Sequence, residues 1–561
     1  MKRFISLLVA LAMSLSLTAC GRSGESTSGQ EEPRRKLTIG IGNSAKVTWE
    51  DNWFTKYMEE RLNCDIELVL FSVDNTEKKT QLAAMAAGNE KLPDIIYRFI
   101  MNQAEVQVYG DEGYFMDLAP YFDDPEWELA KKYGWHEKMR EYHGEDTRKY
   151  VLQKYRTAEG KMYYWPSGSS QVDDMTGAMP FINKTWLDKL GLDMPTTRDE
   201  LVEVLRAFKT QDPNGNGIAD EIPMIGATHA DMYCCDAPLW LMNTFGEYVF
   251  ENYFYTYDEQ TGKIDVPYNT ETYREGLRFI RGLVDEGLLS TLTWTMKEKS
   301  EMTSLWTPAD GDTTVGVIFG YPTSYATKGD EDVKQYVPLP PLKDSYVAVR
   351  AKGGNTYHYI TTDCEDFDLA AEFLMSFCDV DVVRASRRGE EGVDWVERTD
   401  LKSGKPMLDI INPIITEPGN RVWGTYGPAV MWHGDGSPVD EGIFDPEKLN
   451  LSVEDMDAVE YRTYLLKQTA AINLPYAEEH NPKLFFHAIY TEEEGAENGN
   501  SLAELKSYVK ESRAKFCAGE LDPDNDADWN NYVGTLEKLG LSTLIKNTQA
   551  AVDRQETAYN P

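Results

Sequence analysis

Short apolar segments alternate with amphipathic segments along the chain from Lys36 onward. Apolar residues recur at the period of a β-strand in some segments and at the period of an α-helix in the segments between them. The predicted order is strand, helix, strand, helix, strand, over Lys36–Asn43, Asn52–Asn63, Cys64–Val73, Asn75–Glu90 and Leu92–Phe99. This alternation predicts an α/β fold, with a mostly parallel sheet covered by helices on both faces.

The first predicted strand runs into Gly40–Ala45 (GIGNSA), which nearly satisfies a dinucleotide-binding fingerprint, with Ala45 in place of its last glycine. In that motif an acidic residue follows the second strand, whereas Asp65 stands at the start of the second strand here. We therefore interpret the glycines as a sharp turn at the carboxyl end of a strand. Open α/β sheets bind their ligands at this edge.

The first residues have the pattern of an export signal. Lys2 and Arg3 precede an uncharged apolar run that is too short to cross a bilayer as a mature helix. The ending Leu17–Cys20 (LTAC) resembles the lipobox of bacterial lipoproteins, in which the cysteine is lipidated and becomes the new N-terminus. An ordinary signal peptide with an incidental cysteine is the alternative.

Residues 21–35 are small and polar, as in a flexible tether. We therefore predict a signal peptide over 1–19 and a lipidated tether over 20–35. The protein is then anchored to the outer face of the bacterial cytoplasmic membrane, and the lipid is its only contact with that membrane.

Composition narrows the classes of partner. The chain of 561 residues has a formal net charge of −38, which excludes nucleic acid as a partner because nothing would neutralise the phosphates. Its length predicts two or more domains. The cysteines other than Cys20 show no CxxC spacing, so zinc is not predicted. We interpret them as mostly buried apolar side chains and leave a disulfide open; they are Cys64, Cys234, Cys235, Cys364, Cys378 and Cys517.

An ordered series of segments resembles family 1 extracellular solute-binding proteins, the receptors of ABC importers for sugars and oligosaccharides. The first segments in the series are Gly160–Pro166, Phe181–Met224 and Thr272–Leu289. Further segments resemble a branch of large receptors that includes lipoprotein relatives of alginate-binding proteins; they are Tyr336–Ser345, Arg387–Trp395 and Asp526–Ile545. The resemblance runs from about Lys36 to the C-terminus.

The resemblance implies a two-lobe α/β fold of the periplasmic-binding-protein type (type II), which closes on a ligand in the cleft between its lobes. Mapped onto this chain, one lobe holds residues 36–160 plus 331–386, and the other holds 161–330 plus 387–561. The implied function is capture of a carbohydrate, in particular an oligosaccharide, and its delivery to the transmembrane permease subunits of an ABC importer. The receptor is expected to act as a monomer without enzymatic activity.

Oxygen-bearing side chains alternate around two glycines in Thr210–Met224, as they do in a calcium loop of the EF-hand type. The candidate ligands are Asp212, Asn214, Asn216, the carbonyl of Ile218, Asp220 and Glu221. Pro223 occupies the position of the usual distal glutamate, so the loop lacks the ligand that moves a helix in calcium sensors. The resemblance to alginate-binding proteins implies a structural Ca²⁺. A polar turn without an ion is the alternative.

Sugar sites combine flat aromatic platforms with planar polar side chains. Aromatic residues beside glycines or after predicted strands, and polar residues near them, are therefore the candidates. These residues are Trp49, Asp51, Asn102, Trp165, Trp240, Trp306, Tyr321, Arg388, Glu391, Asp394, Trp395, Trp423 and Trp432. Trp49 on the first lobe and Trp395 on the second are the predicted opposing platforms. Packing in a core is the alternative for each aromatic residue.

Two other classes of protein are alternatives to a receptor of an ABC importer. A secreted, cell-surface glycoside hydrolase needs two opposed carboxylates, and 94 acidic residues make such pairs uninformative. A carbohydrate-binding lipoprotein without a role in transport is the other alternative. The signatures GxSxG and HExxH are missing. The sequence does not predict the identity, length, linkage or charge of the ligand.

Overall fold

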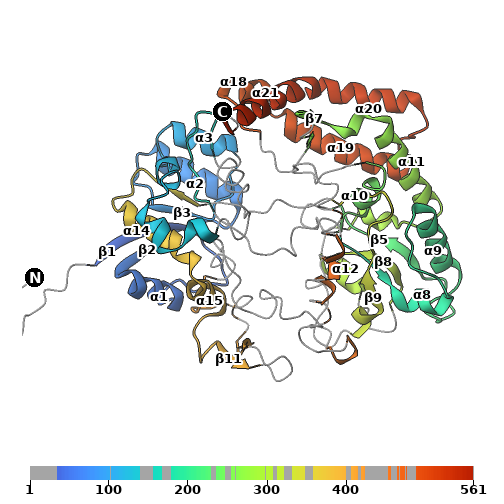
Figure 1. Cartoon of the computed structure of the whole chain (residues 1–561), viewed down its shortest axis with the longest axis horizontal. Coiled ribbons are helices and arrows are strands. Elements are labelled where there is room, and N and C mark those ends of the chain that lie inside the picture. Colours follow the sequence, from blue (N-terminus) through green and yellow to red (C-terminus); the bar gives the residue numbers. More distant parts are fainter. Residues whose placement is uncertain are drawn as a thin grey trace, which may run out of the picture.

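Two four-stranded sheets form the centres of two lobes in the computed structural model (Figure 1). The structure describes residues 34–138 except 102, 156–166, 179–228, 235–246, 254–296 except 259–260, 299–306, 313–320, 331–347, 358–423 except 400–405, 413 and 415–417, short pieces between 453 and 476, and 488–559. The predicted export signal, Cys20 and most of the tether lie outside these residues.

The sheet of the first lobe has its first strand near the centre. Its order is β10 (His358–Ile360), β3 (Ile95–Tyr97), β1 (Arg35–Gly42) and β2 (Cys64–Phe71). Strand β1 is parallel to both β2 and β3, whereas β10 is antiparallel to β3. Strand β1 begins on the side of this lobe that faces away from the second lobe, so the carboxyl ends of β1, β2 and β3 point toward the second lobe (Figure 1).

Helices pack on both faces of the first sheet. The elements are α1 (Trp53–Leu62), α2 (Asn75–Ala87), α3 (Gln103–Asp111), α4 (Ala119–Phe122), α5 (Glu128–Lys132), α14 (Phe367–Met375), η6 (Ser376–Cys378) and α15 (Val380–Arg388). Neighbouring residues of β3 belong to different cores, because Ile95 packs with residues of α1 and α14 while Ile96 packs with residues of α2 and α3. The α/β class and the helices on both faces are confirmed for this lobe.

Local capping sets the ends of α1. The Asn52 side chain accepts hydrogen bonds from the amides of Phe54 and Thr55, and Asn63 ends the helix in the left-handed region at φ 49°. Asparagine is favoured at both positions, because its side chain satisfies free amides and it tolerates positive φ. The predicted helix over Asn52–Asn63 is confirmed to within its two capping residues.

The sheet of the second lobe is mixed. Its order is β5 (Ile222–Ile225), β8 (Val315–Phe319), β4 (Pro180–Asn183) and β9 (Tyr336–Pro338). Strands β5 and β8 are parallel, and β4 is antiparallel to both of its neighbours. The mostly parallel sheet predicted from the N-terminal pattern therefore describes the first lobe and not the second.

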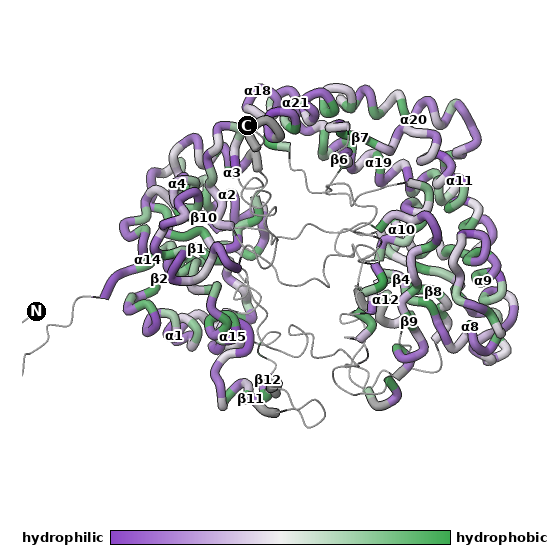
Figure 2. Tube along the Cα trace, in the orientation of Figure 1, coloured by the Kyte–Doolittle hydropathy of each residue, from purple (hydrophilic) through white to green (hydrophobic). Residues whose placement is uncertain are grey.

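Helices also surround the second sheet, and the longest of them extend over the top of the molecule (Figure 1). They are α8 (Lys184–Leu190), α9 (Arg198–Thr210), α10 (Ala237–Met242), α11 (Glu271–Asp285), α12 (Lys299–Trp306), α18 (Glu492–Asn498), α19 (Ser501–Ala518), α20 (Asp526–Lys538) and α21 (Leu541–Tyr559). Polar and apolar residues alternate along most of them (Figure 2). Among the described residues, no helix combines the length and apolar character that crossing a membrane requires.

Smaller elements complete the described chain. Two hairpins are formed by β6 (Thr256–Asp258) with β7 (Lys263–Asp265) and by β11 (Trp395–Thr399) with β12 (Pro406–Ile410). Short 3₁₀ turns are η3 (Pro267–Asn269), η4 (Thr291–Trp294), η5 (Glu331–Gln335) and η8 (Val453–Asp455).

Helix α9 lies close against the second sheet. A capping box of Thr197 and Glu200 begins the helix, and its buried face includes Leu201 and Phe208. A Cβ atom added to Gly316 in β8 would lie 2.3 Å from the Phe208 ring. Glycine at this position therefore allows the helix and the strand to approach each other. Helix α9 leads directly into the predicted calcium loop.

The chain passes between the lobes at places that differ from the predicted boundaries of 160, 330 and 386. Trp165 still belongs to the core of the first lobe, and Tyr336 and Leu339 belong to the core of the second. The proline-rich segment Tyr336–Leu342 stays with the second lobe, because its start forms β9, an edge strand on which Pro338 needs no ladder amide. Residues described between Ile360 and Ala385, together with Trp423, then pack in the core of the first lobe rather than the second.

Candidate functional site

The carboxyl edge of the first sheet holds one of the predicted aromatic platforms. Strand β1 continues into Asn43, whose amide donates to the Phe71 carbonyl at 2.7 Å and whose side-chain oxygen accepts from the Trp49 indole nitrogen at 3.0 Å. Trp49 is partly buried against the first core and keeps an exposed part. Because β2 and β3 flank β1 on opposite sides, this edge is a topological switch point, where α/β sheets bind ligands.

A late segment of the chain closes over the start of α1 at the same edge. The carbonyls of Asn420 and Arg421 accept hydrogen bonds from the amides of Trp53 and Phe54, at 2.8 and 3.0 Å. These amides begin a helix and have no partner within it. The hydrogen bonds therefore attach residues 418–423 to the edge that carries Trp49.

Asp394 binds residues 418–423 through Arg421. Its side chain is buried and accepts hydrogen bonds from the Arg421 guanidinium at 2.6 Å, the Glu390 amide at 2.9 Å and the Asn412 amide group at 3.2 Å. Burial alone would raise the pKa of the Asp394 carboxyl, but these hydrogen bonds outweigh burial and lower the pKa. Asp394 was a predicted hydroxyl partner, and the structure instead shows it satisfied by protein groups.

Three predicted tryptophan platforms are buried and need correction. Trp165 and Trp423 are fully enclosed in the core of the first lobe, where Trp423 packs edge-on against Phe54 at 5.2 Å. Trp395 is only 6% exposed and donates its indole N–H to the Gly389 carbonyl at 3.0 Å. It also lies beneath Arg384 of α15 and so belongs to the first lobe, not the second. None of these rings presents a free face to a ligand in this conformation.

The remaining candidates on the first lobe are polar. Arg388 is half-buried at the end of α15, and Glu391 is exposed in the following turn. Asp51 is exposed, forms an ion pair with Lys56 and has a φ of 57°. Asn102 lies outside the described residues.

On the second lobe, Trp240 is the candidate aromatic residue whose side chain the structure describes. It is half-buried on α10 and meets the Phe319 ring with centroids 5.8 Å apart. Phe319 ends β8 and lies opposite Pro180, the first residue of β4, where the chain arrives from the first lobe. Tyr321 and Trp432 lie outside the described residues, as does the side chain of Trp306.

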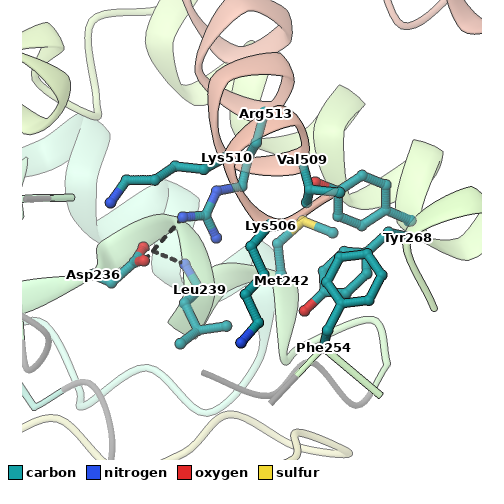
Figure 3. A pocket seen from close by; sticks show the side chains of 10 residues that line it. Asp236, Leu239, Met242, Phe254, Tyr268, Lys506, Val509, Lys510 and Arg513 are labelled. Atoms are coloured by element: carbon teal, nitrogen blue, oxygen red, sulfur yellow. Dashed lines mark hydrogen bonds and ion pairs between the residues drawn. The ribbon is translucent and has the colours of Figure 1, made fainter. Parts of the chain in front are cut away.

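A narrow cavity of about 20 Å³, partly open to solvent, lies beside α10 and was not anticipated from the sequence. Figure 3 shows the Asp236 carboxylate held by Arg513 and by the Leu239 amide, at 2.9 and 2.8 Å. The Phe254 and Tyr268 rings are stacked at 4.9 Å on another wall. A space of about 20 Å³ holds about one water molecule and is too small for a sugar. The side chains come from distant segments, as the 277-residue separation of Arg513 and Asp236 shows.

The predicted calcium loop is an ordered turn after α9. The Asp212 carboxylate accepts hydrogen bonds from the amides of Gly215 and Gly217 at 3.0 and 3.1 Å, and Asp212 itself has a φ of 47°. The Asn216 amide group donates to the Asp220 carboxylate at 3.1 Å. Side chains from both ends of the loop therefore converge, as the alternating pattern predicted.

Glu221 places a carboxylate oxygen in the loop for which the described residues supply no hydrogen-bond donor. Its Oε1 atom is buried and has no hydrogen-bond partner within the described structure. Burial first, and then the nearby charges of Asp220 and Asp212, raise the pKa of the Glu221 carboxyl. A cation would compensate both effects, and Ca²⁺ takes carboxylate, amide and carbonyl oxygens together. Within the described residues, no cluster of three or more His, Cys, Asp or Glu side chains is arranged for a metal, so the fit depends on the mixed oxygen donors.

The described cysteines are free thiols. Four of them are buried and Cys364 is half-buried, while Cys234 lies outside the described residues. Burial raises the pKa of Cys378 and of Cys517 to about 12. Such thiols are unreactive, which agrees with their interpretation as apolar packing residues.

Comparison with known proteins finds likeness along the whole chain. No family model matches it. The fructooligosaccharide ABC transporter substrate-binding protein FusA of Streptococcus pneumoniae is 25% identical over 100% of this chain and 99% of its own length. Lipoprotein LipO of Bacillus subtilis is 29% identical over 32% of this chain and 30% of its own length.

Solved structures share the fold. An HMO-binding, ABC-transporter-associated solute-binding protein of Bifidobacterium longum infantis has a TM-score of 0.69 at 21% identity, covering 93% of this chain and 99% of its own. An EF-hand mutant of FusA in complex with fructo-nystose has a TM-score of 0.67 at 21% identity over 93% and 100% of the two chains. The alginate-binding protein AlgQ2 without calcium ion has a TM-score of 0.58 at 20% identity over 92% and 98%. The predicted resemblance and the two-lobe fold of solute-binding proteins are confirmed.

Proposed function

The chain has the fold of the solute-binding proteins that serve ABC transporters, and from this premise we propose that it is an extracellular receptor that captures an oligosaccharide. The single observation that supports this most is the likeness to FusA, a fructooligosaccharide-binding protein, over the full length of both chains. FusA and the solved relatives named above are binding proteins rather than enzymes. The receptor then delivers its ligand, as a monomer, to the transmembrane permease subunits.

Trp49 and Trp240 give this proposal its physical basis. Each is half-buried at the carboxyl edge of a strand, one on each lobe. A ligand can drive closure only when it binds the closed form more tightly than the open form, which requires contacts from both lobes. Flat rings on the two lobes supply such contacts, because the C–H faces of sugars stack on aromatic rings.

Titration calorimetry with a panel of oligosaccharides, followed by analysis of the recovered sugars, tests the proposal. We expect one class of oligosaccharide to bind and to return intact. Shortened products would support the alternative of a secreted glycoside hydrolase. Tight binding without any contact to a permease, in a pull-down from membranes, would support a carbohydrate-binding lipoprotein without a transport role. A complete lack of oligosaccharide binding would contradict the receptor proposal itself.

We also propose that the loop after α9 holds a structural Ca²⁺. The ligands would be Asp212, Asn214, Asn216, the Ile218 carbonyl, Asp220 and Glu221, and the buried Glu221 Oε1 supports the assignment most. The EF-hand named for FusA and the calcium ion named for AlgQ2 point to the same chemistry in relatives. Because Pro223 stands where sensor proteins have their distal glutamate, the ion would stabilise the fold rather than transmit a signal.

Finally, we propose that Cys20 is the lipidated N-terminus and that the protein is anchored to the outer face of the cytoplasmic membrane. LipO is a lipoprotein by name, and the LTAC ending supports the same processing here. We expect Cys20→Ser to abolish membrane retention or to leave the precursor unprocessed, as measured by fractionation and intact-mass analysis. Ser28→Ala in the tether is the matched control. Cleavage elsewhere, without lipid, would contradict the anchor.

A further inference from the structure

Arg98 follows β3 directly and has an unusual backbone. Its φ is 59°, in the left-handed region, and it is the only residue other than glycine, asparagine and aspartate with positive φ in the part of the chain that the structure describes. A long side chain in this region costs about 1–3 kcal/mol, so the surrounding structure must impose the conformation. Strain of this kind is a starting point for a hypothesis of function.

Side chains from other elements impose this conformation. The Arg98 amide donates to Nδ1 of His358 on β10 at 3.3 Å, and the Arg98 carbonyl accepts from Nζ of Lys78 on α2 at 3.5 Å. One residue further, the Phe99 carbonyl accepts from the Tyr359 hydroxyl at 3.0 Å. His358, Lys78 and Tyr359 are all buried. The backbone at Arg98 is therefore fixed from both sides of β3.

The location of Arg98 matches the expected ligand edge. Strand β3 lies beside β1 on the side opposite to β2, so Arg98 and Asn43 lie at the carboxyl ends of the two strands that form the switch point. Trp49 is hydrogen-bonded to Asn43 at this edge, and Arg98 is half-buried there. Trp49 and the backbone of Arg98 are thus held at the carboxyl ends of adjacent parallel strands.

We propose that Arg98 is a ligand-binding residue of the first lobe, which holds a pair of oxygen acceptors on the sugar. The inference rests on the proposed function and deepens it. A guanidinium offers parallel N–H donors that match two oxygens at once. A uronate carboxylate and two neighbouring hydroxyls both present such a pair, so acidic and neutral oligosaccharides are the two sources of this chemistry.

The test uses the fact that glycine adopts positive φ without strain. In Arg98→Gly the strain and the guanidinium are removed together, so we expect an unchanged or higher melting temperature and at least about a ten-fold loss of affinity. Arg98→Asn, which also tolerates this region, is the second variant. Asn63→Gly is the matched control, because Asn63 has a φ of 49° at the opposite, amino edge of the sheet, before β2.

Each variant is titrated with nystose, a neutral probe, and with a trigalacturonate, an acidic probe. If the variants lose affinity for the acidic probe alone, the group that Arg98 binds is a carboxylate. If they lose affinity for the neutral probe, that group is a pair of hydroxyls. Either result supports the proposal. Wild-type affinity in Arg98→Gly and Arg98→Asn would overturn it while leaving the receptor function intact. Early melting of both variants with normal binding by the folded protein would make Arg98 structural and would also overturn it. A wild-type protein that binds neither probe nor any other oligosaccharide would overturn the inference and the proposed function together.

Discussion

Trp240→Ala is expected to weaken oligosaccharide binding by at least about ten-fold, or about 1.4 kcal/mol, while the melting temperature changes by only a few degrees. The ring is half-buried and meets Phe319 at the end of β8, so its loss removes contact area at the ligand edge without opening the second core. Titration calorimetry and thermal melting of the same preparation measure the two effects separately.

Trp423→Ala is the matched control for this prediction. Trp423 is fully buried among Phe54, Tyr97 and Phe373 and donates its indole N–H to the Thr55 hydroxyl at 2.9 Å. Its loss is expected to lower the free energy of unfolding by about 3–5 kcal/mol. If Trp240→Ala instead melts as early as this control and the folded fraction binds normally, Trp240 is a core residue and not a platform.

Removal of calcium is expected to lower the free energy of unfolding by about 2.7 kcal/mol, if the dissociation constant is ~10 μM and calcium is present at about a hundred times that value. The loop carries Asp212, Asp220 and Glu221 close together, and their repulsion returns when the ion leaves. Thermal melting with EDTA, and again after calcium is restored, measures the change. Ligand affinity is expected to persist, because the loop lies at the end of α9 and not at the strand edges that hold Trp49 and Trp240, the two proposed platforms.

Asp220→Asn serves as the matched variant for the calcium site. It retains the shape of the side chain and removes one negative charge from the ligands, which weakens calcium binding, so the melting temperature of the variant is expected to respond less to EDTA. Equal melting curves with and without EDTA, together with no metal in elemental analysis, would contradict a calcium site at this loop.

The early secondary structure could be predicted from sequence because its determinants are local. Asn52 and Asn63 cap α1, and the strands on either side have apolar residues at strand period. The direction of later strands could not be predicted in this way. Strand β10 is antiparallel to β3 because of the path that the chain takes through the other lobe, which no local pattern records.

In the candidate site, too, features with local determinants could be predicted from sequence, and features that depend on distant residues could not. The loop that we propose to hold Ca²⁺ could be recognised from sequence because its oxygen-bearing side chains lie close together along the chain, from Asp212 to Glu221. Trp165 and Trp423 were misjudged because a tryptophan beside a glycine or proline looks the same whether tertiary packing buries it or exposes it. Arg98 was missed because its strain depends on His358, which is 260 residues away in the sequence.

The interleaved path of the chain has a consequence for how the protein reaches its folded state. The first sheet is incomplete until β10 arrives, and β10 is separated from β3 by most of the second lobe. The second lobe in turn needs α19, near the C-terminus, to cover α11 and to pair Arg513 with Asp236. The core of the first lobe therefore cannot be completed before Trp423 is available, and the core of the second lobe cannot be completed before α19. Contacts of such long sequence separation form slowly, so we expect the apolar strands of both sheets to stay exposed for longer during folding than in a protein whose lobes are each continuous in sequence.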